Sequence, residues 1–191
     1  TKYLVNNLLQ SLVFAIAVTS ILMALLFKTP RMVVISLIPN LVPLIMTAGI
    51  MGYFNIPLKP STLLVFSIAF GISVDDTLHY LARYRQELKN SGGRIAEAAL
   101  TAIRETGVSM FYTSVVLFTG FAVFLASDFG GTQALGLLIS LTLLFAMISN
   151  LVLLPSLLMT LDGFTGPKEF EGVFPMTEDD LPAEEGPKIL N

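Results

Sequence analysis

Five apolar stretches dominate this chain, and each is long enough to cross a lipid bilayer. A spanning helix needs roughly 20 predominantly apolar residues to cross about 30 Å of hydrocarbon. Because lipid offers no hydrogen-bond partner to an open backbone, these stretches are predicted to be helical. The expected fold is an all-α polytopic membrane protein with five transmembrane helices, at 8–27, 32–53, 61–81, 108–126 and 133–161.

The composition excludes an ordinary soluble domain. Apolar residues make up 54% of the chain and charged residues 13%, whereas soluble domains are about 25% charged. A net charge of −3 gives no indication of nucleic-acid binding. Cysteine is absent, which removes disulfides and cysteine metal sites, and no cofactor is expected. The first residue is Thr1 rather than Met, so we expect a piece of a longer polypeptide.

Basic residues in the links between the stretches predict the orientation. Lys28 and Arg31 lie in the first link, and the segment 82–107 carries five Lys or Arg residues. The links 55–60 and 127–132 carry one and none. Because basic residues gather on the cytoplasmic side, the N-terminus is predicted outside and the C-terminus in the cytoplasm.

Two segments outside the apolar stretches have their own expectations. Residues 93–106 carry apolar side chains at helical spacing, which predicts an amphipathic helix along the cytoplasmic interface or a solvated connector helix. Residues 162–191 are rich in Pro, Gly and acids and predict a disordered, acidic cytoplasmic tail. Pro39 and Pro43 lie inside the second stretch; we expect kinks there, with neighbouring helices satisfying the freed carbonyls.

The third stretch contains the most informative motif, "FGISVDDTLHY" at 70–80. Asp75 follows the start of that stretch by 14 residues, or about 21 Å along a helix. An isolated charged Asp at such a depth costs at least about 2.5–3.5 kcal/mol. Asp75 and Asp76 are therefore expected to face protein or water, or to carry protons.

Helical geometry sorts the polar side chains of this motif. Asp75 and His79 share a face, and Gly71, one turn earlier, would let another helix approach closely. Joint ionisation of two neighbouring carboxyls in a medium of low dielectric constant is disfavoured, so one of them is expected to hold a proton near neutral pH. The favoured hypothesis is a proton relay through Asp75 and Asp76.

Other roles for the two aspartates stay open. One alternative is that they are structural hydrogen-bond acceptors, and another is that they bind a cation such as Na⁺. A transition-metal site with the single His79 is less well supported, and so is a hydrolase. No Lys or Arg lies deep in a stretch, so a cationic partner would come from elsewhere. The candidate supporting polar residues are His79, Thr113, Ser114 and Asn150, of which Asn150 is the strongest because a buried amide needs partners.

The segments "GISVDDTLHYLARYRQEL", "EAALTAIRETG" and "TSVVLFTGFAVFLASDFGGTQALGLLISLTLLFAMISNLVLLPSLL" resemble the C-terminal membrane half of an RND-superfamily exporter. The nearest branch is that of the MMPL-like hydrophobe exporters, with a more distant likeness to Patched-type sterol-sensing domains. The resemblance implies twelve spans in two parallel repeats, each with a large extracytoplasmic domain after its first span. This chain would supply spans eight to twelve, one half of the bundle.

The resemblance also implies roles for single residues. The acidic motif of the family falls on Asp75 and Asp76, implied to couple proton movement to export, and His79 matches a usual His. The family often has Tyr in place of Asp76, and commonly Asp in place of Asn150, which puts a second acidic site there in doubt.

The function implied is therefore export of lipids or other hydrophobic molecules driven by the proton motive force, in a bacterial inner membrane and without enzymatic activity. The implied partners are membrane lipids, the N-terminal half of the same transporter, a hydrophobic cargo, and periplasmic or membrane proteins. Two alternatives remain: a proton-driven subunit of an envelope or protein-handling complex, and a sterol- or lipid-sensing module without transport.

Overall fold

The computed structural model describes residues 2–27, 30–57 and 59–162. Within these ranges the chain is helical, with no strand, so the predicted all-α membrane class is confirmed. The predicted tail at 162–191 lies outside the described residues, apart from Asp162. The elements are α1 (Lys2–Phe27), α2 (Pro30–Tyr53), α3 (Pro60–Asn90), α4 (Ile95–Ala122), the 3₁₀ turn η1 (Val123–Ala126), α5 (Gly130–Ile148), the π-helical η2 (Ser149–Leu153) and α6 (Leu154–Asp162).

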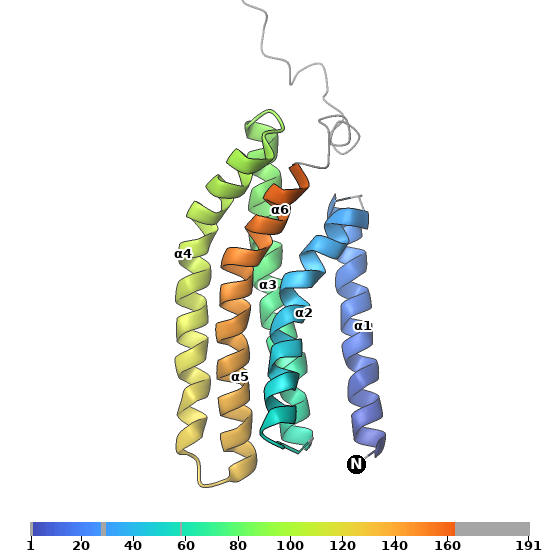
Figure 1. The fold of residues 1–191 in the computed structure, drawn as a ribbon, viewed down its shortest axis with the longest axis vertical. Helices are drawn as coiled ribbons and strands as arrows, with labels where there is room; N and C mark the ends of the chain where they lie inside the picture. Colours follow the sequence, from blue (N-terminus) through green and yellow to red (C-terminus); the bar gives the residue numbers. More distant parts are fainter. Residues whose placement is uncertain (1, 28–29, 58, 163–191) are drawn as a thin grey trace, which may run out of the picture.

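The long helices run alternately up and down (Figure 1). The α3–α4 turn and α6 lie at one end of the bundle, together with the end of α1 and the start of α2. The α4–α5 link and the start of α1 lie at the other end. Helix α1 stands at the edge, beside α2, while α3, α4 and α5 pack closely with one another. The basic segments therefore gather at one end, as alternating crossings require.

Four helical stretches in the described part of the chain are long and apolar enough to cross a membrane: Met32–Tyr53, Thr62–Asn90, Ile95–Ala126 and Gly130–Thr160. They overlap the last four predicted spans, but Thr62–Asn90 runs nine residues past the predicted end at 81, and Ile95–Ala126 begins 13 residues before the predicted start at 108. The first predicted span, 8–27, falls in α1, whose strongly apolar part is the shorter Gln10–Leu25. The protein is a multi-pass membrane protein.

Local sequence explains where α3 begins and where it ends. Pro60 occupies the first turn of α3, where its missing N–H is no loss, and the backbone N–H of Lys59 donates to Thr62 Oγ1 over 2.9 Å. The helix ends before Gly92 and Gly93, whose φ angles of 64° and 88° lie in the left-handed region that favours glycine. This tight turn brings α4 back along α3.

The separate interfacial helix predicted at about 93–106 is not what the structure has. Those residues form the first turns of the continuous helix α4, which runs on into the predicted span. The apolar stripe of Ile95, Ala98, Ala99 and Ala102 is buried against α3 and α6. Pairing with the long extension of α3 buries this face more completely than a membrane surface would.

Close packing of α4 and α5 depends on one glycine. A Cβ built on Gly136 would lie 2.7 Å from the carbonyl oxygen of Phe121 and 2.7 Å from Phe124 Cβ. No side chain fits at that separation, so a residue without Cβ is required for this approach.

The core consists of apolar clusters separated by polar side chains. Toward the α3–α4 turn, Tyr80 and Tyr84 pack with the first turns of α4 and with Leu154 of α6. Toward the opposite end, Val65 packs with Met51 and with α5. Along α3 the polar Ser73 and Thr77 lie between these two clusters, both buried.

The proline-containing part of α2 contacts the π-helical segment η2 next to these buried polar side chains. Pro43 has no N–H, so the carbonyl of Pro39 loses its usual helical donor. Ser149 Oγ donates to that carbonyl over 2.8 Å. A neighbouring helix thus satisfies the freed carbonyl, as predicted, and the π-helical segment η2 supplies the donor.

Candidate functional site

The two aspartates of α3 lie in different surroundings. The side chain of Asp75 is 72% exposed, and His79 beside it is 75% exposed, with 3.7 Å between Asp75 Oδ1 and His79 Nε2. The predicted shared face of these two residues is confirmed. Asp76, about 100° further around the helix, is half-buried.

Asp75 and His79 belong to a continuous exposed face of α3. Its members recur every three or four residues, so they form one stripe along the helix. We call this the α3 stripe: Leu64, Ser67, Gly71, Asp75, His79, Ala82 and Gln86, all exposed. A Cβ on Gly71 would meet no atom within 4 Å. Among the described residues no helix covers this stripe, although α3 is one of the candidate spans.

The opposite face of α3 carries a second set of polar side chains, which are buried and hydrogen-bonded to side chains of other helices. Ser73 Oγ donates to Asn40 Oδ1 over 2.6 Å, and Thr77 Oγ1 lies 3.0 Å from the same oxygen. Thr77 Oγ1 also lies 3.1 Å from Asn150 Oδ1. We call Asn40, Ser73, Thr77 and Asn150 the amide–hydroxyl cluster; each is at most 1% exposed.

The hydrogen bonds of this cluster are complete without a charge. Each amide NH₂ reaches a backbone carbonyl: Asn40 Nδ2 donates to Ser36 O over 2.7 Å, and Asn150 Nδ2 to Ser73 O over 3.2 Å. Two hydroxyl protons, from Ser73 and Thr77, are then available for the two amide oxygens. Buried polar groups need such satisfaction, because each one left unpaired costs about 1–3 kcal/mol.

The predicted supporting residues fall into different places. Asn150 joins Ser73 and Thr77 rather than an aspartate carboxyl. Thr113 is exposed, and its hydroxyl donates within α4 to Ser109 O or Met110 O, the common local behaviour of Thr in a helix. Ser114 is buried, 6% exposed, on the neighbouring face of α4.

Sequence reasoning alone missed Asn40. The signal was its position in "IPNLVP", an amide between two prolines inside an apolar stretch, where a buried side chain needs partners as much as Asn150 does. Among the residues that the structure describes, no group of three His, Asp or Glu side chains is placed to hold a metal ion.

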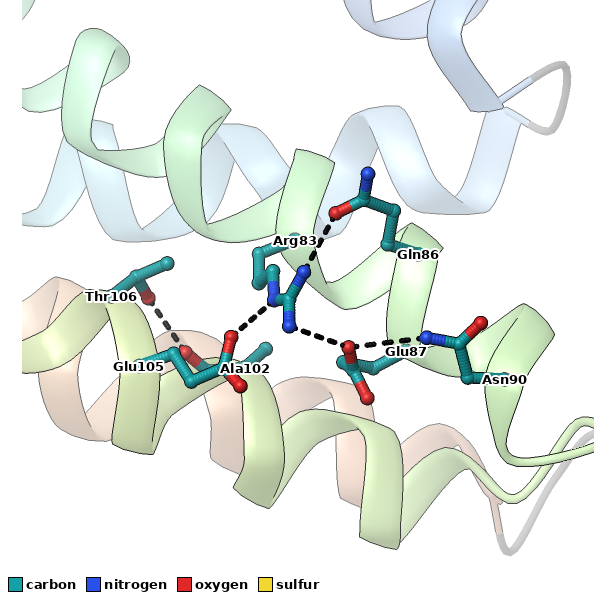
Figure 2. Close-up of polar contacts among 7 residues, drawn as sticks. All are labelled: Arg83, Gln86, Glu87, Asn90, Ala102, Glu105 and Thr106. Carbon is teal, nitrogen blue, oxygen red and sulfur yellow. Dashed lines mark hydrogen bonds and ion pairs between the residues drawn. The ribbon is translucent and has the colours of Figure 1, made fainter.

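One turn beyond His79, a charged junction ties α3 to α4 (Figure 2). The Arg83 guanidinium pairs with Glu105 of α4, with Glu87 at 2.9 Å, and with Gln86 Oε1 at 2.9 Å. Close by, Tyr80, which is fully buried, donates from its hydroxyl to Ala99 O over 3.2 Å. The helix that carries the aspartates is thereby joined to the start of α4 by polar contacts as well as apolar ones.

Comparison with known proteins gives consistent results. The model of the MMPL family matches residues 3–171. A membrane protein of Methanocaldococcus jannaschii is 31% identical over 152 residues, which are 78% of this chain and 39% of that protein. The hopanoid transporter HpnN of Burkholderia multivorans is 26% identical over 147 residues, 76% of this chain and 16% of that transporter. The chain thus spans well under half the length of each of these relatives.

Proposed function

The chain belongs to the MMPL family, and on that premise we propose that it forms one membrane half of an RND-type exporter of lipids or other hydrophobic molecules, driven by the proton motive force. Its similarity to a hopanoid transporter supports a lipidic or similarly hydrophobic cargo. In this proposal Asp75 and Asp76 are the proton relay and His79 supports them.

The observation that carries the proposal is the exposed acid on the α3 stripe. Asp75 and His79 project from a helix that is apolar enough to span a membrane. Ionisable side chains at membrane depth face protein or water rather than lipid, and they mark ion or proton pathways. In this proposal a further part of the protein covers this stripe, and the small residues Ser67, Gly71 and Ala82 suit close approach of a helix.

The part that best fits the stripe is the N-terminal half of the same transporter. The chain spans only 39% and 16% of its two relatives, so a whole transporter has further helices to contribute. A polar side chain on that half would complement Asp75, which has no cationic partner among the described residues nearer than His79. The extracytoplasmic domains would then receive the motion of the helices and handle the cargo.

A proton relay of this kind needs a carboxyl that is reached from one side of the membrane before the conformational change and from the other side after it. A carboxyl of the pair takes up a proton from the outer side, loses its charge, and returns the proton to the inner side when the conformation changes. Each proton that moves down the membrane potential yields about 2.3 kcal/mol per 100 mV. The proposed orientation, with the basic α3–α4 turn in the cytoplasm and the membrane being a bacterial inner membrane, lets protons run inward as cargo leaves.

Carbodiimide labelling of the whole protein in membranes tests the relay without knowledge of the cargo. A hydrophobic carbodiimide modifies protonated carboxyls in apolar surroundings, and mass spectrometry locates the label at Asp75 and Asp76. We expect labelling that falls between about pH 5 and 9, the range of raised carboxyl pKa values, and that disappears from the substituted position in Asp75→Asn and Asp76→Asn.

Asp128, exposed in the α4–α5 link, serves as the internal control for a carboxyl in water. Labelling of the α3 carboxyls that stays constant across this pH range contradicts a proton relay. Such a result favours a structural role or a bound cation for the aspartates.

A further inference from the structure

The amide–hydroxyl cluster has no part in the relay itself, yet it joins three elements at the level of the acids. Asn40 comes from α2, Ser73 and Thr77 from α3, and Asn150 from η2. We propose that this cluster is an uncharged positioning device that sets the rotation of α3, and so holds Asp75 on the α3 stripe and Asp76 at its edge. The inference deepens the proposed function, because the acids it positions are those of the proposed relay.

Helical geometry connects the cluster to the acids. Ser73 and Thr77 face the bundle interior, and Asp75 lies about 200° around the helix from Ser73 while Asp76 lies about 60° to one side of it. A rotation of α3 by one residue, about 100°, would carry Asp75 to the edge of the inner face and turn Asp76 either into the bundle or outward. The same rotation would break the contacts of Ser73 and Thr77 with Asn40 and Asn150.

Thr77 is the central contact of the cluster. Its hydroxyl oxygen lies 3.0 Å from Asn40 Oδ1, 3.1 Å from Asn150 Oδ1 and 3.0 Å from Ser73 O. Its one proton can go to only one of these acceptors at a time. Because Ser73 Oγ donates to Asn40 Oδ1, the Thr77 proton is left for Asn150 Oδ1, and this hydroxyl ties α3 to η2. Loss of the hydroxyl leaves Asn150 Oδ1 without the donor from α3.

Asn150 keeps the cluster neutral. Its NH₂ group faces the carbonyl oxygen of Ser73, where a second acceptor would be repelled. A carboxyl in its place would need a proton to make the same bond, and an amide carries that donor permanently. Asn150 therefore resembles an acid fixed in its protonated state, and the acids at this level are left to Asp75, on the outer face of α3, and Asp76, at its edge.

The charged groups around Asn150 do not alter this conclusion. Segment η2 packs against α2, α3, α5 and α6. Helix α5 has no titratable residue, and those of α2 and α6 are Arg31, Tyr53 and Asp162, at helix ends. Along α3 the nearby titratable groups are Asp75, Asp76, His79 and Tyr80.

The first test asks whether the cluster excludes charge. In the whole protein in membranes, the carboxyl introduced by Asn150→Asp is expected to stay protonated and to react with a hydrophobic carbodiimide at pH 7, while Asp128 does not. A carboxyl at this position that escapes labelling at pH 7, in protein that elutes as the unsubstituted protein does, overturns the claim that the cluster is uncharged.

The second test asks whether the cluster positions the acids. The measured quantity is the ratio of carbodiimide label on Asp75 to label on Asp76 at a fixed pH. Thr77→Val removes only the hydroxyl, and we expect this ratio to change about threefold or more, because rotation moves a carboxyl between apolar and polar surroundings. Thr77→Ser restores a hydroxyl and should return the ratio to that of the unsubstituted protein.

Thr119→Val is the matched control for that substitution. Thr119 is an exposed threonine of α4 whose hydroxyl donates only to its own helix, to Val115 O or Val116 O. The same chemical change there should leave the label ratio unaltered.

The two proposals fail in different ways. Labelling that does not depend on pH in the unsubstituted protein contradicts the relay. Label on the two acids that is the same in the unsubstituted protein and in Thr77→Val, whether high, low or absent, overturns the positioning role. A lowered unfolding temperature in Thr77→Val with an unchanged label pattern assigns the cluster to stability alone and also overturns it.

Discussion

The two faces of α3 differ in whether their polar side chains are buried with partners or exposed without a covering helix among the described residues. On the inner face Ser73 and Thr77 are buried, and their hydroxyl groups have hydrogen-bond partners within 3.1 Å on two other elements. On the outer face Asp75 and His79, in the same two turns, are 72% and 75% exposed. Neutral groups can satisfy each other inside one half of a bundle. Asp75 and His79 are left open, and in the proposed function their partners, or the water that protonates them, lie beyond this part of the bundle.

The largest effect is expected at the two acids, Asp75 on the outer face and Asp76 at its edge. With a 100 mV potential across reconstituted vesicles, loss of one coupled proton removes about 2.3 kcal/mol of driving force. Asp75→Asn or Asp76→Asn should therefore lower the sustainable concentration ratio of cargo by about 50-fold, since each 1.36 kcal/mol is a factor of ten. Transport of a fluorescent lipid analogue by the whole protein, at equal expression, measures this.

Two further outcomes sharpen the result. Collapse of the proton gradient should reduce the unsubstituted protein to the level of the Asn variants. Full transport by both Asn variants would show that these two acids do not couple protons to transport.

A smaller effect, measured as stability, is expected on the inner face. Asn150→Leu keeps a similar volume but removes the acceptor of Thr77 and the donor to Ser73 O. We expect a loss of about 1–2 kcal/mol in the free energy of unfolding, the range for an interhelical hydrogen-bonded group and its abandoned partner. Unfolding in detergent followed by circular dichroism measures this, with exposed Thr119→Val as the variant expected to lose nothing.

Two glycines give a matched comparison between a closed and an open surface. Gly136→Ala places a methyl group 2.7 Å from a backbone atom of α4 and a side-chain atom of η1, and overpacking of that kind costs about 1–3 kcal/mol. Gly71→Ala meets nothing within 4 Å in this half, so it should leave the stability of this bundle unchanged. A loss of transport in Gly71→Ala at normal stability would place another helix against the α3 stripe, whereas normal transport would argue that the stripe is open.

The smallest effect is expected at the charged junction of α3 and α4. Arg83 pairs with Glu105 across the helices near solvent (Figure 2), and exposed ion pairs contribute little. Arg83→Glu should slightly lower the unfolding temperature, by less than Asn150→Leu does. The exchange Arg83→Glu with Glu105→Arg should restore part of the loss at low salt, because the carboxylate introduced at position 83 still faces Glu87, and the difference should fade at high salt. A failure of the exchange to restore stability would show that orientation, rather than charge, holds this junction.

Much of the fold follows from local sequence. Apolar length predicts the spans, since the bilayer allows only helices there, and Gly92 with Gly93 marks the turn between α3 and α4. The shared face of Asp75 and His79 follows from their spacing. The continuity of α4 was not predictable in the same way, because the amphipathic pattern at 93–106 suits a membrane surface and a neighbouring helix equally well.

By itself the sequence determined that the chain lies in a membrane, that α3 carries two adjacent acids within an apolar stretch, and that the prolines of α2 need a hydrogen-bond donor from a neighbour. Only the tertiary structure decided which neighbour. Asn40 and Asn150 are 110 residues apart in the chain, and the sequence around each does not indicate which residues it contacts. Because hydrogen bonds between helices depend on the rotation and register of both, packing alone turned these residues, with Ser73 and Thr77, into one closed cluster and left Asp75 facing outward.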